Sequence, residues 1–499
     1  MKTKFFIVLL MLIFVTFVNG CTKETEYVYE QDEDICVFPV SSYEETLEIT
    51  MGDVMPFYDD GVMNIYHLQN SRSSKSSLFY HPISRLTTTD YLHYVDEGIV
   101  IPFEEDPVSP DAAIGTGSVI KDKNGLYHFF YTGHNANLKP FEVVRHAVSE
   151  DQKEWVKDES FNFNNTGCND FRDPYVYYDK YDDMYYMLIT TRVDDIGVIK
   201  RYGTKDLSVD QYGWEDFGVF FWNDSGSYNM ECPSYVELNG YYYLAYSEQG
   251  DNRVTHYRYQ TERNGEWKRF ERDSIDASGF YAGRIEKAGK DLYAFAWCAG
   301  LTGGFVGEFD WGGNLVAHKL VQSENGELNA VMIDSVYETL SNEVEYKTLN
   351  QEVVTNIGFK GDLFESVCFE KLGKSITRMN FKISANDLKG DFGVTLNVNK
   401  ADNRLGSAVI AFDLTNNKVS CYHNVSNIIR YGDVLATVDF EYEKDKEYEV
   451  DIIIEGEVLV VYLNSTVAVT ARMPGIKNKN FAFYSNNVSA SIYDIKFYI

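Results

Sequence analysis

The sequence predicts an all-β protein, a five-bladed β-propeller followed by a C-terminal β-sandwich. Three observations support this prediction. Between residues 45 and 330, a tight turn followed by an aromatic strand recurs along the chain, with no long helical period between the copies. From about residue 356 the repeat stops, and short alternating strands separated by turn residues replace it. Tyr and Phe, which favour half-buried strands, occur 38 and 32 times.

The repeat consists of a turn rich in Asn, Asp and Gly and a strand rich in Tyr or Phe. Asn-Gly and Asp-Gly favour the positive φ angles of tight β-hairpins. Radial repetition of such hairpins is typical of a propeller, and five turns predict five blades. A large β-sandwich with coincidental turns is the alternative, which the ordered repeat disfavours. The turns lie at Asp60-Gly61, Asn124-Gly125, Asp182-Asp183, Asn239-Gly240 and Gly289.

Residues 1–21 have the pattern of a secretion signal. Lys2 and Lys4 precede an apolar run that ends at Val18, and Cys21 follows in a segment similar to a bacterial lipoprotein box. We therefore expect lipid attachment at Cys21 and a location in the bacterial cell envelope, periplasmic or surface-exposed. Ordinary secretion is the alternative.

Composition divides the rest of the chain into three parts. Residues 22–44 are acidic and lack periodicity, which predicts a flexible tether. Residues 45–330 hold the aromatic repeat and are the predicted propeller. Residues 331–499 are the predicted linker and β-sandwich, the linker being the segment in which helical turns are expected.

The net charge limits the class of partner. Lys and Arg number 45 against 76 acidic residues, which gives a formal net charge of −31. Nucleic acid requires a basic surface, so it is not an expected partner. Broad contact with anionic lipid is disfavoured for the same reason, whereas a neutral substrate is compatible with this charge.

The sequence shows no pattern for a metal or cofactor, and none is expected. No Cys-x-x-Cys pair is present, the histidines lack zinc spacing, and no Gly-rich phosphate loop joins a strand to a helix. The scattered cysteines leave one or two disulfides open. They are Cys36, Cys168, Cys232, Cys298, Cys368 and Cys421.

Three acidic residues stand out by their context. Asp173 precedes Pro174, Glu231 is followed after one residue by Pro233, and Asp53 lies upstream in a similar segment. Because Pro restricts the preceding residue to extended conformations, we expect these acids at strand ends. A propeller gathers such ends around a central funnel. Glycoside cleavage needs a proton donor and a second carboxylate, and a third acid can support the developing charge, so the three acids predict a glycoside-hydrolysing site.

The motifs around these acids resemble those of glycoside hydrolase family 32, the β-fructosidases that include invertases, levanases and inulinases. Arg172-Asp173-Pro174 and Glu231-Cys232 are similar to its Arg-Asp-Pro and Glu-Cys motifs. The resemblance runs from about residue 50 to the C-terminus and implies a five-bladed propeller with a β-sandwich. Further segments resemble family motifs in the same order: 88–94, 115–118, 131–133, 279–282 and 318–320.

The resemblance implies a retaining enzyme for β-fructosidic bonds in fructans or sucrose-type oligosaccharides such as levan, inulin and sucrose. Asp53 would be the nucleophile, Glu231 the acid and base, and Asp173 the transition-state stabiliser. The carboxyl groups of Asp53 and Glu231 would then lie about 5–5.5 Å apart. The implied substrate-binding residues are Arg172, Thr116, Ser118 and Tyr281.

The chain departs from the family pattern at the nucleophile. Where the family usually reads Trp-Met-Asn-Asp-Pro-Asn-Gly, Gly52 replaces the Asn that contacts sugar, and Val54 follows Asp53. Two alternatives therefore stay open. One is an inverting arabinosidase or xylosidase resembling glycoside hydrolase family 43, with carboxyl groups about 6.5–9.5 Å apart. The other is a non-catalytic, surface glycan-binding lipoprotein.

Overall fold

The structure is a computed structural model that describes residues 35–43, 47–69, 81–250, 253–301, 309–361, 363–373, 376–398, 406–424 and 433–499. These residues belong to one compact unit, Asp34–Ile499. The expected secretion signal, Cys21 and residues 22–34 of the expected tether lie outside them. The prediction of a flexible tether is wrong for the described part of that segment, because Val37 and Phe38 are buried and their N–H groups donate to Glu455 Oε2 at 2.9 and 2.7 Å. In the described ranges, no helix is long and apolar enough to cross a membrane.

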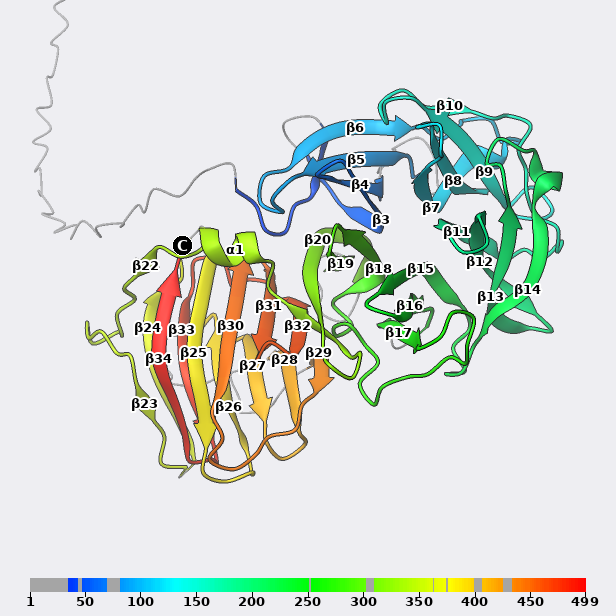
Figure 1. The fold of residues 1–499 in the computed structure, drawn as a ribbon. Coiled ribbons are helices and arrows are strands. Elements are labelled where there is room, and N and C mark those ends of the chain that lie inside the picture. The colour runs from blue at the N-terminus through cyan, green and yellow to red at the C-terminus, as the bar shows by residue number, and fades with distance from the viewer. Residues whose placement is uncertain are drawn as a thin grey trace, which may run out of the picture. The chain divides into compact units, whose positions relative to one another are not determined.

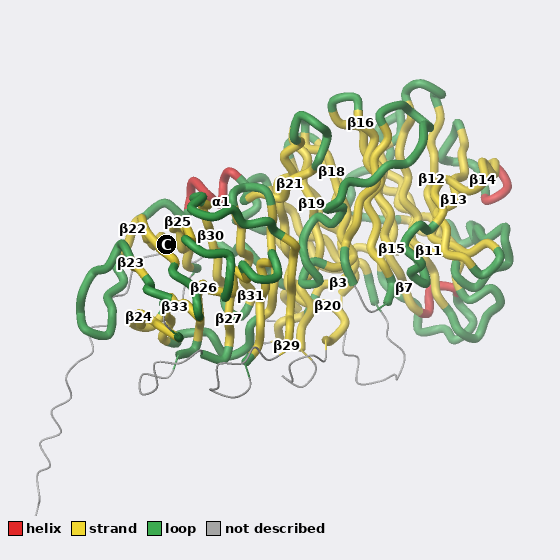
Figure 2. The backbone as a smooth tube through the Cα atoms, turned by 90° about the horizontal axis from the view of Figure 1, so that it is seen from below, coloured by secondary structure: helices red, strands yellow, loops and turns green. Residues whose placement is uncertain are grey.

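The described chain is all-β, and Figure 2 shows how little of it is helical. Its helical elements are α1 (Asp334–Thr339) in the expected linker and the 3-10 turns η1 (Pro110–Ala112) and η2 (Gln211–Gly213), which the sequence did not indicate. Among the described cysteines, Cys36, Cys168, Cys232, Cys298 and Cys421 are free thiols, so they form none of the disulfides that the sequence left open.

The segment expected to form the propeller is built from antiparallel strands joined mainly by hairpins. The predicted turns each connect two paired strands of one sheet, which confirms the hairpins. Its strands are β1 (Ser41–Tyr43), β2 (Leu47–Ile49), β3 (Met51–Asp59), β4 (Val62–Gln69), β5 (Ile83–Thr88), β6 (Val95–Ile101), β7 (Ala113–Lys121), β8 (Tyr127–His134), β9 (Glu142–Ser149), β10 (Val156–Lys157), β11 (Phe171–Asp179), β12 (Met184–Val193), β13 (Ile196–Thr204), β14 (Glu215–Trp222), β15 (Met230–Leu238), β16 (Tyr241–Glu248), β17 (Thr255–Gln260), β18 (Tyr281–Ala288), β19 (Asp291–Leu301), β20 (Phe309–Gln322) and β21 (Leu328–Val331).

These strands form sheets arranged around a common centre (Figure 1). In order, the sheets are β10-β9-β8-β7, β11-β12-β13-β14, β15-β16-β17, and an eight-stranded sheet β18-β19-β20-β3-β4-β5-β6 with β21 paired to β20. The last sheet joins the end of this segment to its beginning through the backbone pair Gly313 and Met51. β1 and β2 form a separate hairpin.

The strands β3, β7, β11, β15 and β18 lie nearest the centre (Figure 1). They contact one another in this order, and β18 also contacts β3, so the contacts close into a ring. These five strands are far apart in the sequence, yet they are neighbours in space. Tyr and Phe side chains pack between adjacent sheets, as in the cluster of Phe130, Phe161, Phe171 and Tyr202.

The C-terminal segment consists of two antiparallel sheets that enclose an apolar core. One has the order β22-β34-β25-β30-β31-β32, with β23 on β34, and the other β24-β33-β26-β27-β28-β29. Met379 and Ile452 from the first sheet join Val394 and Phe483 from the second in this core. The strands are β22 (Glu343–Val344), β23 (Ile357–Gly358), β24 (Phe364–Lys371), β25 (Thr377–Ala385), β26 (Asp391–Leu396), β27 (Ala408–Asp413), β28 (Lys418–His423), β29 (Asp433–Asp439), β30 (Tyr448–Glu455), β31 (Val458–Leu463), β32 (Val467–Arg472), β33 (Asn480–Asn486) and β34 (Ala490–Tyr498).

A buried polar network connects the two segments. Asp276 Oδ1 accepts a hydrogen bond from Thr470 N at 2.8 Å, and Asp276 Oδ2 accepts one from Thr470 Oγ1 at 2.5 Å. The same Oδ2 lies 2.8 Å from His318 Nε2, whose ring reaches the Tyr462 hydroxyl at 3.0 Å through Nδ1. Asp276 and His318 are almost fully buried. Every partner of this carboxylate would lose its acceptor if the side chain were removed.

Asp276→Ala is expected to lower the free energy of unfolding by about 3 kcal/mol, because buried donors are left unpaired. Urea unfolding at neutral pH measures this loss. Asp334→Ala is the matched control, since Asp334 pairs with Lys319 but is 69% exposed, and its loss should stay below about 0.5 kcal/mol. Equal effects of the two substitutions would contradict the role of the network.

Candidate active site

The inner strands share a backbone irregularity near their first residues. In β3, β11, β15 and β18, two residues oppose one residue of the partner strand, and β7 has a register shift between Gly115 and Gly117. Such β-bulges re-aim side chains and are frequent beside active sites. The first bulged residues have positive φ: Asp53 at 41°, Asp173 at 58°, Cys232 at 54° and Ala282 at 53°.

The expectation that Pro holds the preceding residue extended is wrong at this site. Asp173 and Cys232, which precede Pro174 and Pro233, both have a left-handed backbone conformation. The bulge accounts for the difference, because its extra residue leaves the ladder and needs no N–H donor there. Pro is therefore tolerated as the second bulged residue. It marks a bulge near the start of each strand rather than an extended strand end.

The bulges direct side chains from several strands into one cavity of about 280 Å³. Asp53 comes from β3, Arg172 and Asp173 from β11, and Glu231 from β15. The predicted acids are therefore brought together, as the repeat implied. The other lining residues are Leu68, His81, Ala113, Ile114, Gly115, Thr116, Thr132, His134, Glu142, Cys232 and Trp311.

Both carboxylate oxygens of Glu231 accept hydrogen bonds. Arg172 Nη2 donates to Oε1 at 3.0 Å, and the Tyr281 hydroxyl donates to Oε2 at 2.6 Å. Burial and the charge of Glu231 raise the pKa of Tyr281, so this hydroxyl keeps its proton. The Tyr281 ring meets Trp297 edge to face. Glu231 is thus held in one orientation by two donors from neighbouring strands.

Asp173 is more buried than Glu231, with 6% against 18% of the side chain exposed, and two hydrogen bonds hold it. Its Oδ2 accepts a hydrogen bond from Cys232 N at 2.9 Å, and its own N donates to Thr132 Oγ1 at 2.9 Å. Burial raises the pKa of Asp173, and the neighbouring Arg172 guanidinium opposes this rise. The bulge of β11 is thereby linked to β8 on one side and to the bulge of β15 on the other.

Asp53 accepts a hydrogen bond from Trp297 Nε1 at 3.2 Å. Burial and then the negative charge of Glu231 raise the pKa of Asp53 to about 6, against the opposing effects of this hydrogen bond and of Arg284 and Arg172. Its carboxyl group is therefore mainly ionised at neutral pH, and it becomes protonated in mildly acidic solution.

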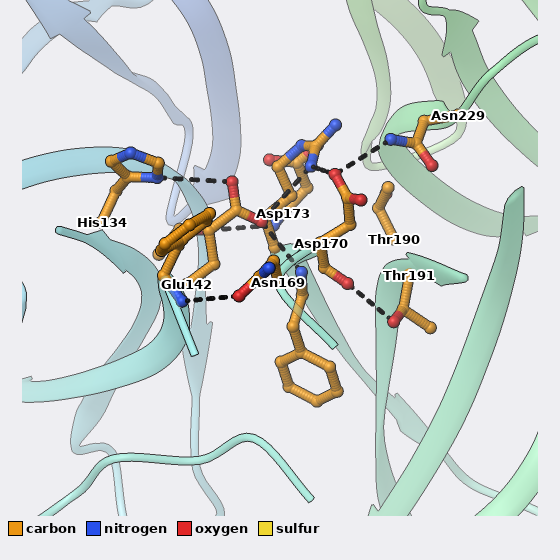
Figure 3. A network of polar contacts seen from close by, with 12 residues as sticks. His134, Glu142, Asn169, Asp170, Asp173, Thr190, Thr191 and Asn229 are labelled. Carbon is orange, nitrogen blue, oxygen red and sulfur yellow. Dashed lines mark hydrogen bonds and ion pairs between the residues drawn. The ribbon is translucent and has the colours of Figure 1, made fainter. Parts of the chain in front are cut away.

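A network of polar contacts that includes His134, Glu142 and Asp170 was not foreseen from the sequence (Figure 3). Arg172 Nη1 donates to Asp170 Oδ1 at 2.8 Å and to Glu142 Oε2 at 3.3 Å. Asp170 in turn accepts a hydrogen bond from Thr191 Oγ1 at its main-chain oxygen. His134 lies 3.5 Å from Glu142. The proximity of Asp170 to Arg172 in the chain was a signal for its role, whereas Glu142 had none.

Of the other predicted sugar-binding residues, Thr116 lines the cavity, whereas Ser118 and Tyr281 do not. Thr116 lines the cavity, and its hydroxyl has no hydrogen-bond partner within the described residues. Ser118 is not among the lining residues, because its hydroxyl accepts a hydrogen bond from Val176 N at 2.8 Å in the interior. Tyr281 reaches Glu231 rather than the cavity wall.

Trp311 explains why residue 52 is a glycine. A Cβ atom on Gly52 would lie 2.4 Å from Cη2 of the Trp311 indole. Trp311 also stacks on His81, with ring centroids 4.0 Å apart, and both side chains line the cavity. Gly52, where the sequence departs from the resembled motif, therefore leaves room for an aromatic wall beside Asp53.

Gly52→Ala is expected to displace Trp311 and to lower the free energy of unfolding by about 1–3 kcal/mol through overpacking. Gly358→Ala is the matched control, because nothing lies within 4 Å of a Cβ atom at that position. Urea unfolding of both variants, and of Gly52→Ala combined with Trp311→Ala, gives the coupling between residues 52 and 311. Purely additive effects would contradict the contact.

A family model matches most of the segment that forms this cavity. Residues 55–348 match the "Glycosyl hydrolases family 32 N-terminal domain", and the match begins just after Asp53. A levanbiose-producing levanase of Bacillus subtilis (strain 168) is 28% identical over 269 residues, covering 50% of this chain and 46% of the relative. A levanbiose-producing levanase of Geobacillus stearothermophilus is 28% identical over 269 residues, covering 50% of this chain and 60% of the relative. The chain thus spans about half the length of these curated relatives.

Solved structures show the same fold. A GH32 beta-fructofuranosidase of Bombyx mori has a TM-score of 0.68 at 16% identity and covers 93% of both chains. The beta-fructofuranosidase of Schwanniomyces occidentalis complexed with fructosyl-erythritol has a TM-score of 0.69 at 16% identity, covering 93% of this chain and 97% of that one. The shared fold is an all-β propeller with a β-sandwich. Because the family model covers more than half of the chain, the protein belongs to glycosyl hydrolase family 32.

Proposed function

We propose that this protein is a retaining glycoside hydrolase that cleaves β-fructosidic bonds in fructans or sucrose-type oligosaccharides such as levan, inulin and sucrose. The observation that carries the proposal is that three strands direct Asp53, Asp173 and Glu231 into one cavity. Family membership supplies the reaction class, and the levanase relatives favour a fructan. Two carboxyl groups flanking a scissile bond are what glycoside hydrolysis requires.

In the first step, Asp53 attacks the anomeric carbon of the fructosyl unit. Glu231 donates its proton to the glycosidic oxygen, the bond between that oxygen and the anomeric carbon breaks, and the rest of the substrate leaves. An ester joins Asp53 to the sugar. Asp173 accepts hydrogen bonds from ring hydroxyls and stabilises the positive charge that develops, while Arg172 holds Glu231 and a neighbouring hydroxyl.

In the second step, Glu231 takes a proton from a water molecule, whose oxygen attacks the same anomeric carbon. The ester bond breaks, fructose leaves, and Asp53 is again a carboxylate. Two successive inversions retain the configuration. Thr116, whose hydroxyl has no hydrogen-bond partner in the described ranges, and the Trp311 indole complete the pocket for the sugar ring.

The propeller is proposed to have five blades that begin with β3, β7, β11, β15 and β18. The closed ring of contacts between these strands supports this count, with the eight-stranded sheet taken as two blades joined at the single pair Gly313 and Met51. Residues 45–330 form the proposed catalytic domain, and residues 331–499 the linker and bracing sandwich.

We also propose export and lipid attachment at Cys21, with residues 22–34 as the tether, because the folded unit begins at Asp34. The basic and apolar character of residues 1–18 supports this location. A polymeric fructan is too large to enter a cell readily, so a cell-envelope enzyme fits the proposed substrate. Labelling of the expressed protein with palmitate, abolished in Cys21→Ala, tests the attachment, and secretion without label supports the alternative.

The pH dependence follows from Asp53. Its pKa is raised to about 6 by burial and by Glu231, and only the ionised form attacks. We therefore expect kcat/KM to fall at least tenfold per pH unit below that value, since burial also raises the pKa of Asp173, whose ionised form is needed in the first step. A pH profile of sucrose hydrolysis measures the acidic limb. A limb centred near the ordinary value for Asp, 3.8, would contradict the assigned nucleophile.

The reaction itself is tested by proton NMR during hydrolysis of levan, inulin and sucrose. The first fructose released should be the β anomer, which later equilibrates with its other forms. Release of the α anomer would contradict retention. Release of arabinose from arabinan, with none from the fructosides, would support the inverting alternative.

A further inference from the structure

A second cavity lies next to the proposed catalytic cavity. Its volume is about 420 Å³, and it is formed by the segment before β11, the turn between β12 and β13, and the segment before β15. Its lining includes Asp170, Arg192, Asp194, Asp195 and Tyr228. None of them takes part in the mechanism described above.

Two contacts connect this cavity to Glu231. Asp170, which lines the second cavity, accepts a hydrogen bond from Arg172 Nη1 at 2.8 Å. Arg172, which lines the first cavity, donates through Nη2 to Glu231 Oε1 at 3.0 Å. The Arg172 side chain therefore joins the lining of the second cavity to Glu231, the proposed proton donor. The second cavity lies on the Glu231 side of the catalytic cavity. This is where the leaving part of a substrate must pass.

Tyr228 forms a fixed aromatic surface in this cavity. Its side chain is 57% exposed, and the Arg192 guanidinium lies over its ring at 4.0 Å from the centroid. Arg192 is itself held, since it donates to the main-chain oxygens of Tyr228, at 3.0 Å, and of Asp195. One face of the ring is thus covered and its orientation set. The other face is open to a ligand.

The polar groups beside Tyr228 suit a neutral, hydroxyl-rich ligand. Asp194 and Asp195 are exposed residues with positive φ at the β12–β13 turn, and Asp170 adds a third carboxylate. Carboxylates accept hydrogen bonds from hydroxyl groups, and they repel anions. An open aromatic face beside convergent acceptors provides both kinds of contact that a sugar unit makes, through its C–H face and its hydroxyls.

We propose that this cavity binds the leaving-group side of a fructan chain, with a sugar unit stacked on Tyr228 and hydrogen-bonded to Asp194 and Asp195. The inference rests on the proposed function and adds that the enzyme favours oligomeric substrates over fructosides with no second sugar. Tyr228 is a binding residue in this assignment and takes no part in bond cleavage.

The experiment compares kcat/KM for a β-2,6-linked fructotriose and for methyl β-D-fructofuranoside, whose leaving group carries no sugar. Tyr228→Ala is expected to lower kcat/KM about tenfold for the trisaccharide, mainly through KM, and to leave the methyl fructoside within about twofold. Tyr228→Phe, which keeps the ring, should behave like the wild type on both. Asp194→Ala should lower kcat/KM for the trisaccharide alone.

Tyr181→Ala is the matched control. Tyr181 is 58% exposed and has the Arg263 guanidinium over its ring at 5.4 Å, but it lies in the β11–β12 turn and outside both cavities. An unchanged ratio of the two kcat/KM values in Tyr228→Ala, with active enzyme, would overturn this inference alone. Absence of hydrolysis of either fructoside by the wild type would overturn the proposed function first.

Discussion

Asp53→Asn is expected to lower kcat by about 10⁴-fold or more on every fructoside, because the amide cannot form the ester intermediate. Few residues can replace Asp53, because its backbone has positive φ and its carboxylate accepts a hydrogen bond from Trp297 Nε1. Asn tolerates this backbone conformation and keeps the shape of the side chain. The loss would therefore report chemistry rather than misfolding, and fructose release under saturating substrate measures it.

The same substitution should stabilise the protein in neutral and alkaline solution. The folded-state pKa of Asp53, about 6, lies above its ordinary value of 3.8. Between these values the folded state holds the proton more tightly, so the unfolding free energy falls as the pH rises. Asp53→Asn removes this penalty and should gain about 2–3 kcal/mol at about pH 8, with no gain at about pH 3.

Asp59→Asn is the control for both effects. Asp59 ends the same strand and accepts hydrogen bonds from Lys121 and Tyr127 outside the cavity. Its replacement should leave kcat unchanged and should not stabilise the protein. Retention of more than about a hundredth of the activity in Asp53→Asn would argue against the nucleophile assignment.

Glu231→Ala is expected to reduce kcat/KM for sucrose and fructans by about 10²–10⁴-fold, because the leaving oxygen no longer receives a proton. The size of the effect should depend on the leaving group. β-D-Fructofuranosyl fluoride, which loses fluoride and needs little protonation, should retain most of its first-step rate. A uniform loss over both kinds of substrate would contradict the role of Glu231 as the acid.

Added azide provides an independent readout of the same variant. With the base absent, water attacks the ester slowly, whereas azide needs no deprotonation and fits the space that the side chain leaves. We expect azide to restore turnover of the fluoride and to form β-fructosyl azide. Glu237→Ala is the matched control, because Glu237 lies on the same strand, β15, and pairs with Lys180 at the surface.

Part of this molecule could be predicted from the sequence because its signals are local. The hairpin turns depend on residues that accept positive φ, and the strands on runs of Tyr and Phe, so the all-β fold was foreseen. Arg172-Asp173-Pro174 and Glu231-Cys232 are short motifs, and the family match confirms the resemblance that they carry. The convergence of Asp53, Asp173 and Glu231 followed from the repeat, since repeated hairpins place strand starts around one centre.

The tertiary structure decided what depends on contacts between distant strands. The bulges gave Asp173 and Cys232 a left-handed backbone that the following Pro did not indicate. The Ser118 hydroxyl pairs with Val176 N and the Tyr281 hydroxyl with Glu231, and each of these partners lies on a neighbouring inner strand. The glycine at residue 52 is explained by the closeness of the Trp311 indole. The role of Glu142 is explained by its hydrogen bond from Arg172. Pairs this far apart leave no pattern in one sequence, so packing alone establishes them.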